Sequence, residues 1–451
     1  MKKLLGEEYE SFYSALTTKE AERGFRINRI KTDDETFDSI NIFPSNKLDY
    51  IDGGYILTKK TDALGNTPHH ASGMIYVQDP GAMATAEAVR IQKDMLILDL
   101  CAAPGGKSTQ VASKLRGTGL IVSNEYVSKR AKILVSNFER MGITNGIVTS
   151  LDTREIAKLF DSVFDLVIAD APCSGEGMFR KDVPAIEEWS EENVEICRVR
   201  QSEILKNAAT TVKDGGYLLY STCTYSLEEN EMMVDAFLED HPDYRLVEVS
   251  DKIKAVTKGG VSFPEAAEKN LEFTRRFYPH ISNGEGQFIA LFKRNTTNMP
   301  TFLYKDSTKP PKKETLEIVE RFFRDNLKER PSGRVAMHGD NIVLISHNYP
   351  IPPYSVFSSG VLIGEIKGKT LIPSHQFYSA YGCYFIRQEN ITDDAAAYKY
   401  LSGEQIPASF NDAGICAVLY HGVPLGGGKM SGGNINNHYP KGLRFKQADN
   451  Y

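Results

Sequence analysis

The chain has 451 residues, of which 41% are hydrophobic and 25% charged, and its formal net charge is −6 at pH 7. This length predicts two or three domains, and the absence of any long apolar run argues against a membrane protein. The six cysteines include no C-x-x-C pair, which argues against a disulfide framework and a zinc site; we therefore expect a protein of the reducing cytoplasm without a bound metal.

Residues 1–75 are predicted to form a small mixed α/β segment. A helical pattern at 7–16 precedes residues 23–31, where basic and apolar residues alternate as in an edge strand with a solvated cationic face. The adjacent His69 and His70 have no third ligand nearby in the sequence, so we expect them on the surface or in a loop rather than at a metal.

Residues 76–294 alternate strand and helix patterns with short connections, which favours a doubly wound α/β sheet. A helix is expected at 82–89, before the first of these strands. The expected strands are 96–101, 119–124, 146–150, 164–169, 216–222 and 244–249, followed by a hairpin at 276–280 and 287–293.

The first of these strands runs into a loop of small residues and then into a helical pattern at 108–115. The loop reads Cys101-Ala102-Ala103-Pro104-Gly105-Gly106-Lys107. It is neither G-x-G-x-x-G nor the phosphate-binding G-x-x-x-x-G-K-[ST], because Cys101 stands where the second motif needs a glycine. Such a loop suits a ligand with a single carboxylate, such as S-adenosylmethionine, but taken alone an ordinary strand-to-helix turn fits equally well.

Two cysteine-containing motifs follow later strands of the same region. Asp170-Ala171-Pro172-Cys173-Ser174-Gly175 comes after the strand at 164–169, and Ser221-Thr222-Cys223-Thr224 ends the strand at 216–222. Because the carboxyl ends of parallel strands meet at one edge of a sheet, both cysteines are expected to face the crevice of the first loop.

The composition of the remaining chain differs from that of residues 76–294. Residues 295–314 are polar and broken by prolines, as in a linker, and residues 315–451 begin with a helix and continue as a Gly- and Tyr-rich, β-rich region. This last region contains the run P-L-G-G-G-K at 424–429 and N-N-H-Y-P-K-G-L-R at 436–444, in which we expect Tyr439 and Leu443 to be packed.

With these motifs the chain resembles the Nol/Nop/Sun family of RNA cytosine-5 methyltransferases. The hallmarks of that family are an A-P-G-G-K loop, D-x-P-C-S-G and S-T-C-T, and all three stand here in family order. The resemblance is closest to the bacterial RsmF type, which methylates 16S ribosomal RNA, and it covers nearly the whole chain. It implies a Rossmann-like class I methyltransferase sheet of seven strands with a terminal antiparallel hairpin. It also implies an RNA-facing N-terminal segment and a PUA-like RNA-binding C-terminal region, in which relatives often carry an aromatic residue at the position of Gly427.

The resemblance also assigns the chemistry of the cysteines. Cytosine C5 becomes nucleophilic when a thiolate adds to C6, and the adduct must later be released. The family uses the cysteine of S-T-C-T as nucleophile, here Cys223, while the other one, here Cys173, serves turnover. DNA cytosine-5 methyltransferases attack with the cysteine of a Pro-Cys pair, so the motifs alone leave the order open. The cysteines expected to be buried packing residues are Cys197, Cys383 and Cys416.

Two further residues are expected at the reacting base. Asp170 would hold the amino edge of the cytosine or the ammonium of the cofactor, with helix capping after Pro172 as the alternative. Lys107 would position the base or favour the thiolate, with a solvated lysine at a helix start as the alternative. The catalytic set is therefore Cys223, Cys173, Asp170 and Lys107.

The expected cofactor is S-adenosyl-L-methionine. It would contact the loop, for which the residues are Cys101, Ala102, Ala103, Pro104, Gly105, Gly106 and Lys107, together with Asp170. Glu125 lies about 20 residues beyond the loop, the spacing at which an acid accepts both ribose hydroxyls. Asp152 resembles the family's adenine contact. Arg130 resembles a cofactor neighbour, with a helix-surface ion pair as the alternative.

The implied partner is RNA, specifically a single-stranded or flipped cytosine of 16S rRNA, either as naked rRNA or within the small ribosomal subunit. Arg180 and Lys181 are candidate contacts to its backbone, and residues 23–31 would face it. The net negative charge counts against tight binding of naked RNA, although residues 300–451 carry a slight basic excess. A transfer RNA substrate and a non-catalytic role as an RNA-binding assembly factor remain open at this point.

Overall fold

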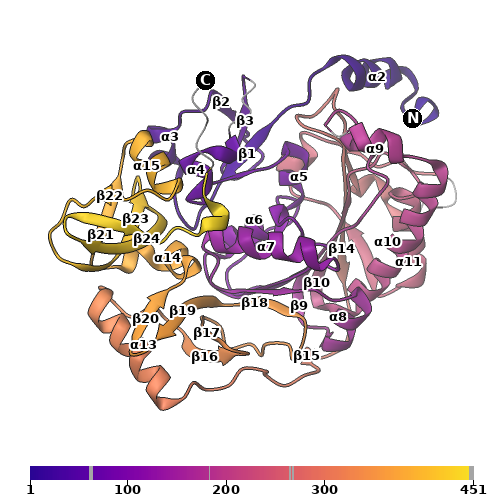
Figure 1. Cartoon of the computed structure of the whole chain (residues 1–451). Coiled ribbons are helices and arrows are strands. Elements are labelled where there is room, and N and C mark those ends of the chain that lie inside the picture. Colours follow the sequence, from indigo (N-terminus) through magenta and orange to yellow (C-terminus); the bar gives the residue numbers. More distant parts are fainter. Residues whose placement is uncertain (60–63, 182, 264–265, 267–268, 446–451) are drawn as a thin grey trace.

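Runs of aliphatic residues form the parallel strands at the centre of the molecule. A computed structural model describes residues 1–59, 64–181, 183–263, 266 and 269–445, and within them the central sheet has ten strands (Figure 1). The parallel strands, in spatial order, are β10 (Val212–Thr222), β9 (Phe164–Asp170), β5 (Leu96–Asp99), β6 (Leu120–Asn124) and β7 (Gly146–Thr149). Each overlaps an expected strand, so the predicted α/β fold is confirmed.

The terminal hairpin also forms. β14 (Gln287–Arg294) is antiparallel to β10, and it pairs in turn with β13 (Arg275–Phe277) and β11 (Tyr244–Val247). A short β12 (Lys258–Gly259) extends this edge. The opposite edge is closed by a strand that the sequence did not indicate: β18 (Val356–Ser359), from the C-terminal region, pairs antiparallel with β7.

Alternating side chains bury both faces of the sheet. Ile97 and Leu98 are neighbours on β5 and both are fully buried, but they belong to different core clusters. Burying each such side chain contributes about 1.5–3 kcal/mol. One face packs against α6 (Gly106–Leu115) and α7 (Ser128–Met141), which lie together in front of the sheet in Figure 1. The other face packs mainly against α8 (Thr153–Leu159), α10 (Glu191–Thr211) and α11 (Glu231–Asp240). The shorter helices of this region are α5 (Pro80–Thr85), α9 (Val183–Glu188) and α12 (Asp251–Lys254).

The N-terminal segment forms a four-stranded antiparallel sheet of order β2-β3-β1-β4. Its strands are β1 (Gly24–Ile27), β2 (Ser45–Lys47), β3 (Gly54–Leu57) and β4 (Ile75–Val77). Its helices are α1 (Lys2–Leu5), α2 (Tyr9–Thr18), α3 (Asp34–Ile40) and α4 (Pro68–Ala71).

The C-terminal region contains two sheets rather than one. After β15 (Thr301–Phe302), which pairs with β8 (Phe160–Asp161), and α13 (Lys313–Asn326) comes a sheet of order β16-β17-β19-β20. Its strands are β16 (Arg334–His338), β17 (Asn341–Ile345), β19 (Val361–Lys367) and β20 (Thr370–Pro373). Following α14 (His375–Tyr381), the last sheet has the order β21-β23-β24-β25-β22. Its elements are β21 (Gln388–Ile391), α15 (Asp394–Leu401), β22 (Ile406–Pro407), β23 (Gly414–Tyr420), β24 (Val423–Ser431) and β25 (Asn434–Asn437).

The two ends of the chain share one hydrophobic core. Phe25 and Phe37 of the N-terminal segment belong to the same buried cluster as Tyr400 and Tyr420 of the last sheet. His69 lies inside this cluster, with its ring centroid 5.2 Å from that of Tyr420. In Figure 1 the N-terminal sheet and the last sheet accordingly lie side by side.

This arrangement corrects several expectations about the terminal regions. His69 is fully buried and its Nε2 lies 3.1 Å from the carbonyl oxygen of Ile40, so it is a core residue, not a surface one. Burial lowers the pKa of His70 to about 3, so this imidazole is neutral. Tyr439 is buried as expected, but Leu443 is 40% exposed.

The position of the Arg26 side chain differs most from the expectation. Its side chain does not lie on a solvated face but is buried between the N-terminal sheet and α6. The guanidinium donates to the carbonyl oxygen of Gly106 (2.8 Å), to Thr109 Oγ1 (2.7 Å) and to Gln78 Oε1 (3.0 Å). It therefore anchors the N-terminal sheet to the helix that follows the first loop.

Candidate active site

The two cysteines lie where the neighbouring parallel strands β9 and β10 end. The Sγ atoms of Cys173 and Cys223 are 3.2 Å apart, and the backbone N–H of Cys223 donates to Cys173 Sγ (3.3 Å). Both thiols are free and partly buried. The expectation that the two motifs share a crevice therefore agrees with the geometry.

Cys173 holds its proton tightly. The hydrogen bond with Cys223 and burial together raise the pKa of Cys173 well above its ordinary value, and the negative charge of Glu229 adds to this effect. Cys173 therefore keeps its proton, and either sulfur can donate in the contact between the two thiols. A thiol that receives a hydrogen bond is stabilised as a thiolate, whereas one that stays protonated is a poor nucleophile.

Lys107 and Asp170 form an ion pair beside the thiols. Lys107 lies in the first turn of α6, and its Nζ is 2.7 Å from Asp170 Oδ2, while Ser221 Oγ donates to Asp170 Oδ1 (2.6 Å). Burial lowers the pKa of Lys107, but the attraction of Asp170 outweighs this effect, so the net shift is upward; Cys223 also raises it. The side chain of Lys107 thus stays protonated beside the two thiols. Asp170 faces Lys107 and Ser221 rather than capping a helix.

Sequence reasoning missed the residue that connects the two cysteine loops. Glu229 is fully buried, and its carboxylate accepts hydrogen bonds from the backbone N–H of Ser174 (3.1 Å), from Ser174 Oγ (2.5 Å) and from Gln201 Nε2 (2.7 Å). Burial raises the pKa of Glu229, and these donors offset part of the increase. The only signal in the sequence is an acid shortly after S-T-C-T, just before α11.

Glu125 and Arg130 lie beside the first loop. Glu125 follows β6, is 3% exposed and accepts a hydrogen bond from the backbone N–H of Val127 (2.9 Å). Arg130 Nη1 is 3.4 Å from Glu125 Oε2, and Arg130 Nη2 donates to the carbonyl oxygen of Ala103 (2.8 Å). Arg130 therefore forms an ion pair, which was the alternative to a cofactor contact, and it also contacts the first loop.

Asp152 caps α8. Its carboxylate accepts a hydrogen bond from the backbone N–H of Arg154 (2.9 Å) and pairs with that residue's guanidinium, while Glu155 completes a capping box. The residue stands beyond the carboxyl end of β7, at the edge where an adenine contact is expected.

The first loop offers what a carboxylate ligand needs. α6 begins after Gly105, whose φ is +114°, and no side chain caps its first turn, so the backbone N–H groups there remain available. A Cβ at Gly105 would come within 2.9 Å of Leu134 Cδ1, so the position requires glycine. Together with Glu125, whose carboxylate can accept hydrogen bonds from a ribose, these residues fit S-adenosylmethionine. Burial raises the pKa of Cys101, so this thiol is inert and contributes packing.

Arg180 and Lys181 are not available for RNA in this structure. The Arg180 side chain is 4% exposed and its Nε donates to Glu285 Oε2 (2.8 Å), while Lys181 Nζ pairs with Asp79 Oδ2 (2.5 Å). Arg180 instead holds the segment after Cys173 against the loop that leads into β14, and Lys181 holds it against Asp79, which caps α5. The part of the chain that the structure describes contains no cluster of potential metal ligands and no helix long and apolar enough to span a membrane.

Comparison with known proteins gives matches to the catalytic region and to the N-terminal segment. Residues 86–293 match the family described as 16S rRNA methyltransferase RsmB/F, and residues 1–80 match the N-terminal domain of 16S rRNA methyltransferase RsmF. A ribosomal RNA small subunit methyltransferase F of Aeromonas salmonicida is 31% identical over 87% of this chain and 84% of its own length. The chain belongs to the RsmF family of 16S rRNA methyltransferases.

Other members and structures agree with this membership. The RsmF-family enzyme of Aliivibrio fischeri (strain MJ11) is 29% identical over 93% of this chain and 91% of its own length. A solved methyltransferase homologue from Pyrococcus horikoshii has a TM-score of 0.58 and 26% identity, covering 65% of this chain and 92% of its own.

The RsmF PUA domain matches residues 389–445, which is the last sheet, so the sheet at 334–373 lies outside the three matched ranges. At Gly427, where an aromatic was expected in relatives, the ring of Tyr378 fills the space: a Cβ there would lie 2.1 Å from Tyr378 Cε1.

Proposed function

We propose that this RsmF-family chain transfers a methyl group from S-adenosylmethionine to C5 of a cytosine in 16S rRNA through a covalent bond between Cys223 and C6. The observation that carries the proposal is the pair of thiols 3.2 Å apart beside the Lys107–Asp170 ion pair. One thiol is positioned to attack and the other to assist release. We expect this reaction in the cytoplasm, where ribosomal subunits are made.

In the first step Cys223 attacks C6 as a thiolate. The hydrogen bond from Cys173 and the ammonium of Lys107 stabilise that thiolate before attack. Asp170, held by Lys107 and Ser221, is placed to accept from the amino edge of the cytosine. When bound at the first loop, S-adenosylmethionine supplies an electrophilic methyl group for C5.

The proton affinity of Cys173 changes as the reaction proceeds. The hydrogen bond with Cys223 is the largest cause of its raised pKa, and this cause disappears once the sulfur of Cys223 is bound to C6. Cys173 then ionises more readily and takes the proton from C5, after which the bond between Cys223 and C6 breaks. The same thiol that stabilises the nucleophile at the start thus becomes the base at the end.

Two cysteine variants test this order. Purified Cys223→Ala should give neither 5-methylcytosine nor a covalent complex when incubated with 16S rRNA or 30S subunits and labelled cofactor. Cys173→Ala should block turnover and accumulate a methylated protein–RNA complex that survives denaturing electrophoresis. Cys383→Ala is the matched control and should behave as wild type, because this cysteine lies outside the crevice and is exposed, not buried as expected, whereas Cys197 and Cys416 are buried.

The reverse pattern, a trapped complex with Cys223→Ala and none with Cys173→Ala, would show that Cys173 attacks. Labelling of transfer RNA but not of rRNA would show that the substrate is transfer RNA. Labelling of neither RNA would favour a non-catalytic assembly factor.

A further inference from the structure

A cavity lies between the N-terminal segment and the chain that follows Cys173. Its volume is about 810 Å³, within the range of ~300–1,000 Å³ that is usual for ligand sites. Residues 16–24, which include the connection from α2 to β1 in Figure 1, line one side of it. None of the residues that line the cavity in the described structure belongs to the first loop, and neither Glu125 nor Asp170 is among them. The cavity is therefore separate from the expected cofactor site.

Two contacts place this cavity beside the catalytic crevice. Gln78, which lines the cavity, lies against the first turn of α6: a Cβ added to Gly106 would come within 3.1 Å of Gln78 Nε2. Gly106 directly precedes the lysine of the Lys107–Asp170 ion pair. On the other side Met178 follows Gly177, whose backbone N–H donates to the carbonyl oxygen of Cys223 (2.8 Å). The cavity thus adjoins both walls of the crevice in which the target base would react.

The amide of Gln78 has an unused donor. Its Oε1 accepts a hydrogen bond from Arg26 Nε (3.0 Å). Because a guanidinium group only donates, the amide oxygen must face Arg26, and this fixes the direction of Nε2. Among the described residues Nε2 has no hydrogen-bond acceptor. Such an oriented amide can donate to a phosphate, a ribose or a base carbonyl.

The charge of the lining favours an anionic ligand. Its cations are Lys19, Arg23, Arg180 and Lys181, whereas its acids are Glu20 and Asp79, in a chain whose net charge is −6. Arg180 and Lys181 are held by acids and form part of the wall. Lys19 is exposed and has no ion-pair partner among the described residues, so it is suited to attract phosphates. The lining also offers apolar surface for a base, to which Leu16, Val77 and Met178 contribute.

We propose that this cavity holds a nucleotide adjacent to the target cytosine in the RNA strand. Gln78 Nε2 donates to that nucleotide, and Lys19 supplies positive charge for the phosphates of the strand. The inference rests on the proposed function, because it takes RNA as the substrate and Cys223 as the residue that binds the target cytosine. The contact with Gln78 exists before and during methyl transfer, so its loss should raise KM for the RNA and leave kcat unchanged.

The variant Gln78→Glu separates RNA binding from the support of Arg26. Its carboxylate still accepts from Arg26 Nε, but it has no N–H to donate, and it repels phosphates. In methylation assays with 16S rRNA or 30S subunits and labelled cofactor, we expect KM for the RNA to rise about tenfold, the magnitude of a lost hydrogen bond to a charged acceptor. Calorimetry should show unchanged cofactor affinity, and the melting temperature should not fall.

Two further variants accompany this measurement. Gln92→Glu makes the same charge change at an exposed residue outside the cavity and should leave KM as in wild type. Lys19→Ala should raise KM and reduce the slope of its salt dependence by about one, as expected for one lost phosphate contact.

Crosslinking of the complex trapped by Cys173→Ala locates the nucleotide. The full-length protein is irradiated with ultraviolet light while the complex is intact, and its peptides are searched by mass spectrometry for attached RNA. We expect the peptides that contain Gln78 or Met178 to carry a nucleotide contiguous in the RNA with the cytosine bound to Cys223.

An unchanged KM of Gln78→Glu would overturn the inference, and so would crosslinks of these peptides to distant nucleotides only. A higher KM with an equal loss of cofactor affinity or of melting temperature would limit Gln78 to supporting Arg26 and would overturn it as well. Trapping by Cys173→Ala is measured first, on the same RNA. If the complex forms while the cavity variants behave as wild type, only the nucleotide site is wrong; if no complex forms, the proposed reaction is wrong.

Discussion

Replacing Glu139 by glutamine should stabilise the protein, and the gain should grow with pH. Burial raises the pKa of this carboxyl from 4.5 to about 7, so the native protein binds the proton more tightly than the unfolded chain does. Below pH 4.5 both states are protonated and the residue contributes nothing. Between pH 4.5 and about 7 the unfolded chain ionises first, so stability falls as pH rises; above pH 7 the full cost is present.

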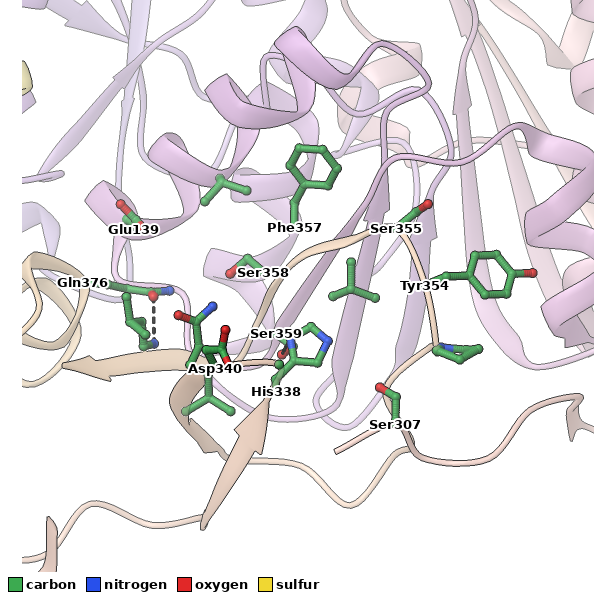
Figure 2. A pocket seen from close by; sticks show the side chains of 17 residues that line it. Glu139, Ser307, His338, Asp340, Tyr354, Ser355, Phe357, Ser358, Ser359 and Gln376 are labelled. Carbon is green, nitrogen blue, oxygen red and sulfur yellow. Dashed lines mark hydrogen bonds between the residues drawn. The ribbon is translucent and has the colours of Figure 1, made fainter. Parts of the chain in front are cut away.

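The size of the effect follows from the shift. A difference of about 2.5 pKa units corresponds to about 3 kcal/mol at pH 8, and to about 1.4 kcal/mol at pH 5.5, where the native carboxyl is still protonated. Glutamine has nearly the same shape and no charge, so it should remove this cost. Glu139 borders a hollow beside β18 whose other titratable residues in the described structure are His338, Asp340 and Tyr354 (Figure 2), and none of them supplies a compensating cation above pH 7.

Urea unfolding followed by circular dichroism at pH 5.5 and pH 8 measures the difference directly. We expect the midpoint of Glu139→Gln to exceed that of wild type at both values and by more at pH 8. The exposed Glu329→Gln should show no such trend. A stability gain that is constant over pH, or a loss of stability at pH 8, would refute the idea that the charge of the partly buried Glu139 carboxylate destabilises the protein.

Three further variants probe the catalytic region. Glu125→Ala should weaken S-adenosylmethionine binding by about 1–3 kcal/mol in calorimetry, because a buried acceptor for the ribose is lost, and unchanged affinity would remove Glu125 from the cofactor site. Glu229→Gln should lower kcat about 10- to 100-fold with little change in KM or melting temperature, since a charged acceptor that holds the Cys173 loop is lost; a parallel fall in melting temperature would indicate a merely structural role. Arg26→Met should lower both thermal stability and cofactor affinity, because its bonds to Gly106 and Thr109 hold the start of α6; normal cofactor affinity would limit Arg26 to joining the two sheets.

The central sheet could be predicted from the sequence because its strands are continuous apolar runs. A parallel strand buried on both faces leaves little freedom in composition, so the runs before Asp170 and Ser221 identify both strands and the edge where their cysteines meet. The ion pair of Lys107 with Asp170 lies at the same edge, but the sequence did not indicate that these two side chains pair.

Arg26, Glu229 and β18 could not be predicted, for different physical reasons. An arginine in an alternating strand is normally solvated, and its burial depends on acceptors 80 residues away in sequence. Glu229 has no motif of its own, because it acts on backbone and side-chain donors of another loop. The strand Val356–Ser359 is short and half serine, so only the exposed edge of β7 makes it a strand.

The pairing of β18 with β7 has a consequence for how the protein is made. The ribosome releases β7 about 200 residues before its partner, so for that interval the catalytic sheet has an open edge, and open edges pair with other chains. The apolar face of the N-terminal sheet stays uncovered for even longer, until Tyr400 and Tyr420 have been synthesised and pack against it. A chain interrupted near Lys293 would keep its cysteines and its first loop but would leave both surfaces uncovered. The last third of the sequence is thus needed to complete the first two thirds, and an unfinished copy is at risk of aggregation.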